Sequence, residues 1–372
     1  MRITGAVLES TGRDRPFASS RPLTVGELEL DPPGRDEVLV RIEAAGVCHS
    51  DLSVVDGNRV RPTPMLLGHE AAGIVEQVGD GITDLAAGQR VVTVFLPRCE
   101  ECAACRTGGR LPCTKGSAAN EAGELLGGGR RLHRDGGSVH HHLGVSGFAT
   151  HAVLHRASVV PVDDDVPPEV AAVLGCAVLT GGGAVLNAGR PGADDDVMVV
   201  GLGGVGMAAL LVALSITADG SGTVIGVDAN PDKLDRAREL GASAAWSPAE
   251  VAEQGITAPV VIEAAGHPRA FETAVAATAP GGTMVTVGLP SPDARASIAP
   301  LGITAGARTI IGSYLGSAVP ARDIPAYAAM WREGRLPVEE LVSSTIGLED
   351  LNAAMDELAE GRAVRQIIRF GD

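Results

Sequence analysis

The sequence is poor in aromatic residues, since its 372 residues include only 5 Phe, 2 Tyr and 2 Trp. Its hydrophobic core must therefore be built mainly from Val, Leu, Ile and Ala. Positive charge is also in deficit, and the formal net charge is −16 at pH 7. Because nucleic acids and anionic membranes bind basic surfaces, this balance argues against both as partners. The small basic cluster of Arg130, Arg131 and Arg134 does not change this, and we expect it in a solvated loop.

Segments typical of export or membrane insertion are not expected either. The N-terminal MRITGAVLES does not join a charged segment to a long apolar run, so it does not resemble a signal peptide. The longest apolar run that we identify, Val205 to Ile216, is too short to cross a bilayer. We therefore expect a cytoplasmic protein, whose six cysteines bind metal or react rather than form disulfides.

Length and pattern predict two domains and an α/β fold. Residues 1–45 alternate apolar and polar in short bursts, which is typical of antiparallel strands, whereas residues 97–145 look irregular. From about Pro167 to Ile311, short apolar runs alternate with helical segments, which predicts a doubly wound parallel sheet. The tail from about Pro320 is expected to return to the first domain. The expected parallel strands are Val197–Val200, Val224–Val227, Val260–Glu263, Met284–Val287 and Thr309–Ile311.

A glycine-rich turn, GLGGVG at residues 201–206, follows the first of these strands and precedes an apolar helix. The order strand, GxGxxG, helix is typical of a dinucleotide site. Gly201 permits the tight turn, Gly203 lets the backbone approach a pyrophosphate, and Gly206 allows close helix–strand packing. A glycine-rich turn without a ligand is the less favoured alternative. The expected cofactor contacts in this region are Thr180, Gly201, Gly203, Gly204, Val205 and Gly206.

Asp228 ends the next expected strand and lies 22 residues after Gly206, close to the spacing of about 20 residues found for the ribose-binding acid. Its carboxylate would accept hydrogen bonds from the ribose hydroxyls and repel a 2′-phosphate. No arginine directly follows it to favour NADP, although Lys233 lies one helical turn further on. The sequence therefore favours NAD.

Four of the six cysteines lie in one short segment, as Cys99, Cys102, Cys105 and Cys113. Four thiolates can surround one tetrahedral zinc ion and leave no open coordination position, so we expect a structural zinc. A redox-active Cys-x-x-Cys pair is less favoured because it leaves at least one thiol unused. A zinc-ribbon nucleic-acid module is less favoured because the chain is acidic.

The other two cysteines indicate a second metal site. Cys48 lies in the segment Gly46–Glu70 together with His69, and Cys176 lies just before the nucleotide-binding pattern. Each cysteine alone would more often be a small buried apolar residue. Together with His69 they form a Cys₂His set, which leaves zinc one open position for catalysis. In the same segment, Ser50 can pass a proton and Asp51 can orient a ligating imidazole.

These motifs resemble the medium-chain, zinc-dependent alcohol dehydrogenases. The segment GHEAAGIVEQVGDGI at residues 68–82 resembles their zinc signature, and the match continues through the four cysteines and GLGGVG to AVRQIIRF at residues 363–370. The chain is similar to the long-loop members, the classical and glutathione-dependent formaldehyde dehydrogenase classes. This resemblance implies a GroES-like catalytic domain (1–177 and 319–372, with a structural-zinc lobe at 96–116) and a Rossmann domain (178–318). It also implies a homodimer or tetramer.

The resemblance also assigns roles to residues. Cys48, His69 and Cys176 match the catalytic zinc ligands. Glu70 matches a carboxylate that coordinates the metal transiently, although a buried structural carboxylate is an equal alternative. Asp51 matches the group that holds the ligating histidine, and Ser50 the hydroxyl that takes the alcohol proton. The remaining matches are His49 and Arg365 at the cofactor pyrophosphate, Asp228 and Lys233 at the ribose, and Phe95, His142, Leu143 and Leu289 in the substrate pocket. The run His140–His142 is interpreted as a loop feature rather than a metal site.

The expected function is the reversible oxidation of primary aliphatic or aromatic alcohols to aldehydes, by hydride transfer from a zinc-bound alkoxide to NAD. In many family members the hydroxyl that takes the alcohol proton, here Ser50, belongs to a proton relay that ends in a histidine three residues further on. This chain has Ser53 at that position, so its relay must end in water, His49 or another group. A thiol-dependent formaldehyde dehydrogenase is the alternative, and Arg59 and Ser117 depart from that class at its thiol-binding positions. A non-catalytic nucleotide-binding protein on the same fold is the remote alternative. It would be expected to lack Cys48, His69 or Cys176, and all three are present.

Overall fold

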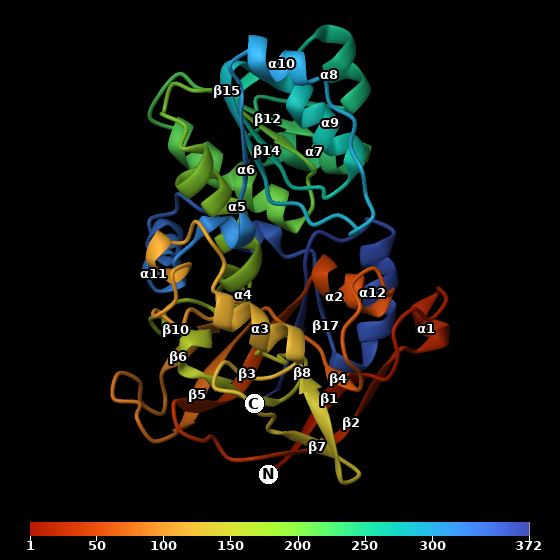
Figure 1. Ribbon diagram of the computed structural model, residues 1–372, viewed down its shortest axis with the longest axis vertical. Helices are drawn as coiled ribbons and strands as arrows, with labels where there is room; N and C mark the ends of the chain where they lie inside the picture. Colours follow the sequence, from red (N-terminus) through yellow and green to blue (C-terminus); the bar gives the residue numbers. More distant parts are fainter. Residues whose placement is uncertain (372) are drawn as a thin grey trace. The chain divides into compact units, whose positions relative to one another are not determined.

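The computed structural model describes residues 1–371, which divide into two compact units (Figure 1). Unit 1 comprises residues 1–176, 320–329 and those from 338 onward, and unit 2 comprises residues 177–319 and 330–337. The expected junctions, 177/178 and 318/319, each differ from these by one residue. Residues 330–337 belong to unit 2, whereas the sequence pattern had assigned the whole tail to the first domain.

Unit 1 is rich in strands. A closed barrel contains, in order, β1 (Arg2–Leu8), β2 (Leu23–Leu30), β7 (Leu132–Arg134), β8 (Gly137–His141) and β4 (Met65–Leu66). A 7-stranded sheet contains β10 (Val159–Pro161), β6 (Arg90–Thr93), β5 (Ala71–Val78), β3 (Glu37–Val47), β18 (Gln366–Arg369) and β17 (Ser344–Ile346), with β9 (His151–His155) paired to β3. The α-helices of this unit are α1 (Phe17–Ser20), α2 (His49–Val55), α3 (Thr114–Ala122), α4 (Pro168–Val173) and α12 (Leu351–Ala359), while α11 (Pro320–Arg332) begins in unit 1 and ends in unit 2.

Strand β3 organises the sheet of unit 1, because it pairs with β5, β9 and β18. Its residues Val38, Val40 and Ile42 are buried in an aliphatic cluster whose fully buried aromatic members are Phe17 and Phe148. The core is therefore aliphatic, as the composition predicts. Antiparallel pairing of β3 with β5 brings the C-terminal end of β3 beside the start of β5, and this pairing positions the site described below.

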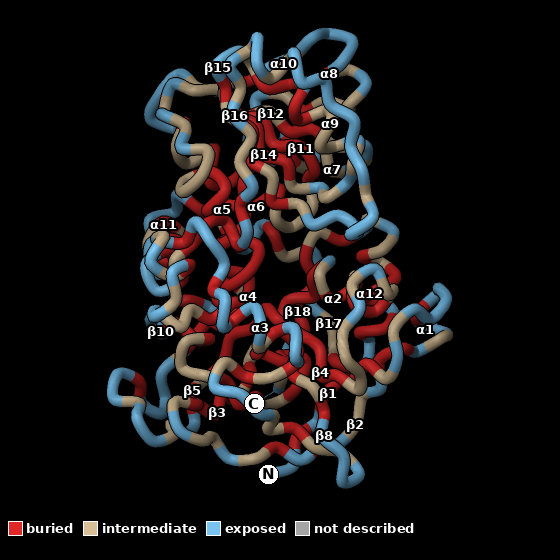
Figure 2. Tube along the Cα trace, in the orientation of Figure 1, coloured by how far each residue is buried: buried red, intermediate tan, exposed pale blue. Residues whose placement is uncertain are grey.

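Unit 2 contains a 6-stranded sheet in which all neighbouring strands are parallel. The order is β13 (Ala244–Trp246), β12 (Val224–Val227), β11 (Val197–Val200), β14 (Ala258–Glu263), β15 (Thr278–Thr286) and β16 (Thr309–Gly312). The helices are α5 (Leu179–Gly183), α6 (Gly204–Thr217), α7 (Pro231–Glu239), α8 (Pro248–Gln254), α9 (Pro268–Ala277) and α10 (Pro300–Ala305). Figure 2 shows β11 and β14 buried and the segment around α10 largely exposed. This arrangement confirms the predicted doubly wound sheet.

The chain order reverses between β11 and β14, since the sheet continues in one direction to β12 and in the other to β14. Ligands of doubly wound folds bind at such a reversal, beyond the carboxyl ends of the strands. Met198 and Val200 of β11 join a core cluster with Val251 of α8 and Ala274 of α9. Because side chains alternate along a strand, Val197 and Val199 point to the opposite face.

Residues 97–145 are more regular than predicted. Helix α3 begins after Cys113, whose Sγ accepts a hydrogen bond from the Gly116 N–H at 3.3 Å. The β7–β8 hairpin lies in the barrel. Its strands are short and carry polar residues, so the sequence there shows no clear apolar alternation from which strands could be predicted.

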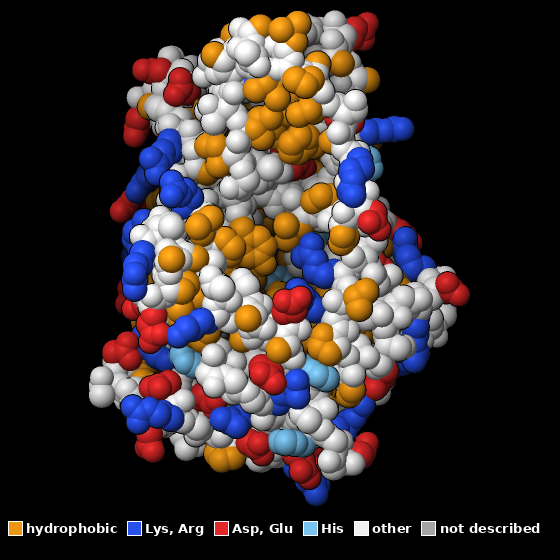
Figure 3. Space-filling view, in the orientation of Figure 1, with side chains coloured by type: hydrophobic (Ala, Val, Ile, Leu, Met, Phe, Trp, Pro, Cys, Tyr) orange, Lys and Arg blue, Asp and Glu red, His pale blue; other side chains and the backbone are white. Residues whose placement is uncertain are grey.

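The basic cluster belongs to this hairpin region and is paired rather than free in solvent: Arg131 binds Glu37 and Arg134 binds Glu9, each at 2.8 Å. On the face in Figure 3, acidic and basic side chains are interspersed.

A helical segment from Pro168 to Gly189 corrects the prediction that no apolar segment is long enough to span a bilayer. It contains α4, a π-helical segment η3 (Leu174–Val178), α5 and a second π-helical segment η4 (Ala184–Gly189). Its length and a mean hydropathy of 1.8 suffice for a membrane span, yet 89% of the most apolar window is buried inside the protein. Such burial is that of a core helix. The sequence pattern missed it because glycines and Thr180 interrupt the apolar run.

Candidate active site

Four predicted metal-site residues converge in unit 1. One donor atom from each of Cys48, His69, Glu70 and Cys176 lies within 4.8 Å of the others. The distance from His69 Nε2 to Cys176 Sγ is 3.4 Å, and all four residues are buried. The residues proposed as ligands from cysteine count and spacing are therefore adjacent in the folded chain.

The pairing of β3 with β5 explains why Cys48 and His69 meet. Strand β3 ends one residue before Cys48, and β5 begins just after Glu70. The N–H of Gly46 donates to the carbonyl oxygen of Glu70 at 2.8 Å, so the two ligand segments lie side by side. Gly68 has φ +91°, and a Cβ there would overlap the backbone of Phe148. Glycine before His69 is therefore required by the backbone.

Cys176 comes from a helix rather than from a strand. It lies in the π-helical segment η3, a geometry that is frequent at functional sites. The preceding Gly175 packs on the carbonyl oxygen of Thr93 at the end of β6, where a Cβ would overlap. This close approach fixes the helix against the sheet and holds the Cys176 thiol beside His69.

The buried thiols differ in acidity. A hydrogen bond from the Cys176 thiol lowers the pKa of Cys48 well below its ordinary value, and the positive charge of Arg365 adds to this effect. The same hydrogen bond and burial raise the pKa of Cys176. Burial raises the pKa of Glu70 to about 7, against the opposing effect of Arg365. The site thus favours a thiolate at Cys48, the form of cysteine that binds metals.

Asp51 connects both ligand segments. Its Oδ2 accepts a hydrogen bond from the Cys48 N–H at 3.0 Å, and its Oδ1 lies 2.9 Å from His69 Nδ1. Burial acts to raise the pKa of Asp51, but the charge of His69 and the contact with His142 outweigh it and lower the pKa. An ionised Asp51 holds the Nδ1 proton of His69, which leaves Nε2 directed to the thiols. This is the orientation that a metal ligand needs.

Two rings lie against His69. The ring centroids of Phe95 and His142 are each 5.5 Å from that of His69, and both rings are nearly perpendicular to it, at 89°. His142 Nδ1 is also 3.2 Å from Asp51 Oδ1, a contact that the sequence pattern did not predict. Leu143 is buried next to His142, whereas Leu289 is 46% exposed and belongs to unit 2.

Arg365 points into unit 1. It is 2% exposed, its Nε lies 3.3 Å from Glu70 Oε1, and its Nη1 donates to the carbonyl oxygen of Val47 at 3.0 Å. Pairing of β18 with β3, which places Gln366 opposite Val47, explains this position. The structure therefore adds a pairing with Glu70, while the contact with a cofactor pyrophosphate stays a prediction.

The predicted relay residues lie in the first turns of α2. His49 is exposed and Ser50 is half-buried directly beside Cys48. The Ser53 hydroxyl donates to the carbonyl oxygen of His49 at 2.9 Å. The Ser53 side chain is thus bonded to the backbone of its own helix.

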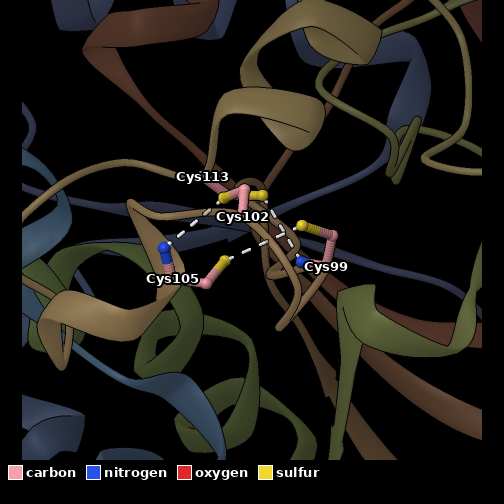
Figure 4. Close-up of side chains that lie close together, drawn as sticks. All are labelled: Cys99, Cys102, Cys105 and Cys113. Carbon is pink, nitrogen blue, oxygen red and sulfur yellow. Dashed lines mark hydrogen bonds between the residues drawn. The ribbon is translucent and has the colours of Figure 1, made fainter.

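Cys99, Cys102, Cys105 and Cys113 form the second group of thiols (Figure 4). Their sulfur atoms lie within 4.8 Å of one another, and the six cysteines of the chain, all within residues 1–371, are free thiols. The N–H groups of Cys105 and Cys99 donate to Cys102 Sγ and Cys113 Sγ, both at 3.4 Å. Backbone N–H groups that face sulfur favour thiolates, so this donor set fits a closed tetrahedral zinc.

The glycine-rich turn occupies the predicted position in unit 2. Gly201 has φ +93°, and a Cβ on Gly206 would overlap the carbonyl oxygen of Gly201. Asp228 follows β12, and its two carboxylate oxygens accept hydrogen bonds from Leu202 N at 2.7 Å and Asn230 N at 2.9 Å. These bonds hold the carboxylate beside the turn and leave lone pairs for a ribose. Thr180 is buried in α5, and Lys233 lies in α7.

Comparison with known proteins agrees with this geometry. Residues 34–164 match the family model of the alcohol dehydrogenase GroES-like domain, and residues 204–332 match that of zinc-binding dehydrogenases. The chain is 33% identical over 367 residues to alcohol dehydrogenase class-3 of Drosophila melanogaster, covering 95% of this chain and 96% of that protein. Its identity to alcohol dehydrogenase B of Mycobacterium tuberculosis is 35% over 366 residues, with the same coverage.

Among solved structures, benzyl alcohol dehydrogenase from Acinetobacter calcoaceticus matches with a TM-score of 0.89 and 30% sequence identity. The match covers 100% of both chains. The likeness therefore extends over both units and not only over one conserved motif. With its GroES-like and nucleotide-binding domains, this chain belongs to the family of medium-chain, zinc-dependent alcohol dehydrogenases.

Proposed function

We propose that this protein oxidises primary alcohols to aldehydes, with NAD as the hydride acceptor, and reduces the aldehydes in the reverse direction. The convergence of Cys48, His69 and Cys176 supports this proposal most strongly, because three protein ligands leave a metal one open position for a substrate oxygen. Aromatic alcohols fit a site with Phe95 and His142 beside the ligand His69. The likeness to a benzyl alcohol dehydrogenase supports the same class of substrate.

We propose one catalytic and one structural zinc per chain. Cys48, His69 and Cys176 would hold the first, and Glu70 lies close enough to be a transient fourth donor. The four clustered cysteines would hold the second. When bound, the catalytic zinc supplies a Lewis acid that lowers the pKa of the substrate hydroxyl.

The residues around the metal site have separate roles in the proposed reaction. Asp51 keeps the proton of His69 on Nδ1, and Ser50 accepts the proton that the alcohol loses. Phe95 lines the site with an apolar ring. NAD, when bound, would supply the acceptor for the hydride that leaves the alcohol carbon, so that alcohol and NAD⁺ would become aldehyde, NADH and one proton. The glycine-rich turn and Asp228 of unit 2 would bind the cofactor.

The proposed function is tested by following NADH formation from a series of primary alcohols, and from formaldehyde, with and without added thiols. We expect benzyl and medium-chain alcohols to be oxidised without a thiol. A thiol-dependent formaldehyde dehydrogenase is the second candidate, because the chain is similar to a class-3 enzyme. Turnover of formaldehyde only in the presence of a thiol would support that candidate instead.

Ser50→Ala is expected to lower kcat for alcohol oxidation by about 10²-fold or more, which is the usual contribution of a positioned proton acceptor. The dissociation constant of NAD should stay near the wild-type value, because Ser50 is not part of the glycine-rich turn. Ser50→Thr keeps the hydroxyl and serves as the control. Steady-state kinetics together with NAD titration measure both effects, and unchanged turnover of Ser50→Ala would remove Ser50 from the relay.

Asp228→Ser is expected to raise the KM for NAD by about 10-fold or more, since hydrogen bonds to a charged group contribute roughly 1.5–3 kcal/mol. It should also improve the use of NADP, because a carboxylate that repels the 2′-phosphate is removed. Asp228→Asn keeps the size of the side chain and controls for loss of support to Leu202. If the ratio of NAD to NADP efficiency is the same in all three proteins, another residue selects the cofactor.

We also propose a homodimer located in the cytoplasm. Strand β16 is one of the two edges of the parallel sheet, and its residues are exposed or half-exposed, which supports assembly through the sheets of unit 2. The free thiols support a reducing compartment. Light scattering of the purified protein would separate a monomer, a dimer and a tetramer by mass.

A further inference from the structure

We propose that His142 is a positioning residue for the metal ligand His69 and acts through Asp51. The inference rests on the proposed zinc site, because it gives His142 a role only through that ligand. Two imidazole nitrogens converge on one carboxylate oxygen: Asp51 Oδ1 lies 2.9 Å from His69 Nδ1 and 3.2 Å from His142 Nδ1. The three side chains are 0–1% exposed, so the contact is shielded from bulk solvent.

The negative charge of this one carboxylate oxygen faces both rings, with the hydrogen bond to His69 and the 3.2 Å contact with His142 on the same atom. The other oxygen of Asp51 binds the backbone N–H of Cys48. Asp51 therefore joins the segments of two metal ligands, and His142 approaches it from a third side. Replacing His142 would remove an imidazole that packs against this fully buried carboxylate, and would loosen the carboxylate beside His69. The hydrogen bonds of Asp51 with Cys48 N and His69 would remain, so the expected effect is a shift of the carboxylate and of the His69 ring rather than their release.

The backbone holds His142 in place for this contact. In the parallel pair of β4 and β8, His141 lies opposite Leu66, so His142 lies just beyond the end of the strand that leads to His69. The Ser146 hydroxyl accepts a hydrogen bond from His142 N at 3.0 Å and donates to the carbonyl oxygen of Leu66 at 2.9 Å. This bridge ties the backbone of His142 to the chain just before the ligand.

The neighbouring histidines have other partners. His141 Nε2 accepts a hydrogen bond from Arg131 N at 3.0 Å, and His140 Nδ1 lies 3.0 Å from the carbonyl oxygen of Pro64. The run of three histidines is thus not one metal site. Of these three residues, His142 is the one whose ring nitrogen reaches Asp51.

A wall of the substrate pocket is the competing role for His142, and two matched variants separate the roles. His142→Phe keeps an aromatic ring beside His69, as Phe95 already provides, but has no ring nitrogen near Asp51. His142→Asn loses the ring but places an amide N–H₂ near the position of Nδ1. If His142 only lines the pocket, Phe should preserve its role better than Asn does. If His142 positions His69, Asn should preserve its role better than Phe does.

The test measures metal binding in the full-length protein. Zinc transfer to a competing chelator is followed for the more weakly held of the two ions, and the visible spectrum of Co²⁺ at the same site reports ligand geometry. We expect the site in His142→Phe to bind zinc about 10-fold more weakly, the low end of the loss usual when a residue that supports a metal ligand is replaced. The cobalt bands should shift. His142→Asn should stay within about 3-fold of the wild type, a difference of about 0.65 kcal/mol.

The outcomes separate this inference from the proposed function. If the wild type binds two zinc ions and His142→Phe holds both as tightly, with an unchanged cobalt spectrum, the positioning role is wrong and the function stands. A change confined to the KM for alcohols, with zinc affinity unchanged, would likewise show that the positioning role is wrong and that the function stands. If the wild type binds only the ion of the four-cysteine cluster, the proposed catalytic site itself is wrong. Thermal unfolding of both variants checks that any lost affinity is not lost folding.

Discussion

Cys176→Ser is expected to leave one zinc ion per chain instead of two and to lower kcat/KM for benzyl alcohol by at least about 10³-fold. A serine hydroxyl is a far weaker zinc ligand than a thiolate, so the Cys₂His set loses one of its three donors. The Lewis acid contributes several kcal/mol to such a reaction, and 1.36 kcal/mol corresponds to a factor of about ten in rate. Zinc analysis and steady-state kinetics on the same preparation measure both quantities.

The substitution is well suited to this test, because serine is nearly the size of cysteine. Cys176 is 4% exposed and packs in a buried helix. A much smaller side chain at this position would leave a cavity and add a folding defect, which serine avoids. Cys48→Ser is the matched variant and should give the same two losses. Two zinc ions with near wild-type turnover in either variant would contradict the assignment of the catalytic ligands.

Cys113→Ser is expected to remove the other zinc ion and to lower the melting temperature on the order of 10 °C. Cys113 is fully buried, precedes α3, and its Sγ accepts hydrogen bonds from Cys99 N and Gly116 N. Zinc sites with four protein ligands contribute about 10 kcal/mol or more to the folding of small domains. Only part of that will appear in the unfolding of unit 1, and in a domain of roughly 150–250 residues a loss of about 3 kcal/mol lowers the melting temperature by roughly 6–12 °C.

Calorimetry and limited proteolysis of residues 96–116 would measure this effect. The proteolytic cuts should fall within the lobe, because the chain between the four cysteines has little regular structure apart from a short 3₁₀ turn. Lys115→Ala is the control, since Lys115 forms an exposed ion pair with Glu101, and exposed pairs contribute little. An unchanged melting temperature with both ions retained in Cys113→Ser would show that the cluster does not hold a structural metal.

The parts of the fold that could be predicted are those with a strong local pattern. Buried parallel strands such as Val197–Val200 are continuous apolar runs, and the glycines at 201 and 206 mark the turn that follows. The six cysteines could be divided by spacing alone into a cluster of four and a distant pair. These features depend on residues near one another in the chain or on the few residue types that bind zinc.

Features that depend on long-range pairing could not be predicted. His142 reaches Asp51 because β8 pairs with β4, and the register of two short strands is not visible in the sequence. Arg365 is buried against Glu70 because β18 pairs with β3. Helix α3 was missed because its sequence, TKGSAANEA, has no apolar periodicity. Its start is set by the Cys113 cap rather than by a hydrophobic face.

If the metal-site residues Cys48, His69 and Cys176 serve the direct transfer of hydride from an alcohol carbon to NAD, deuterium on that carbon must reach the cofactor. The most direct measurement uses benzyl alcohol with two deuterium atoms on the reacting carbon and determines the mass of the NADH formed. We predict one deuterium per NADH molecule with the wild-type protein and no detectable product with Cys176→Ser. NADH without deuterium, or no NADH from a protein that holds two zinc ions, would contradict the claim.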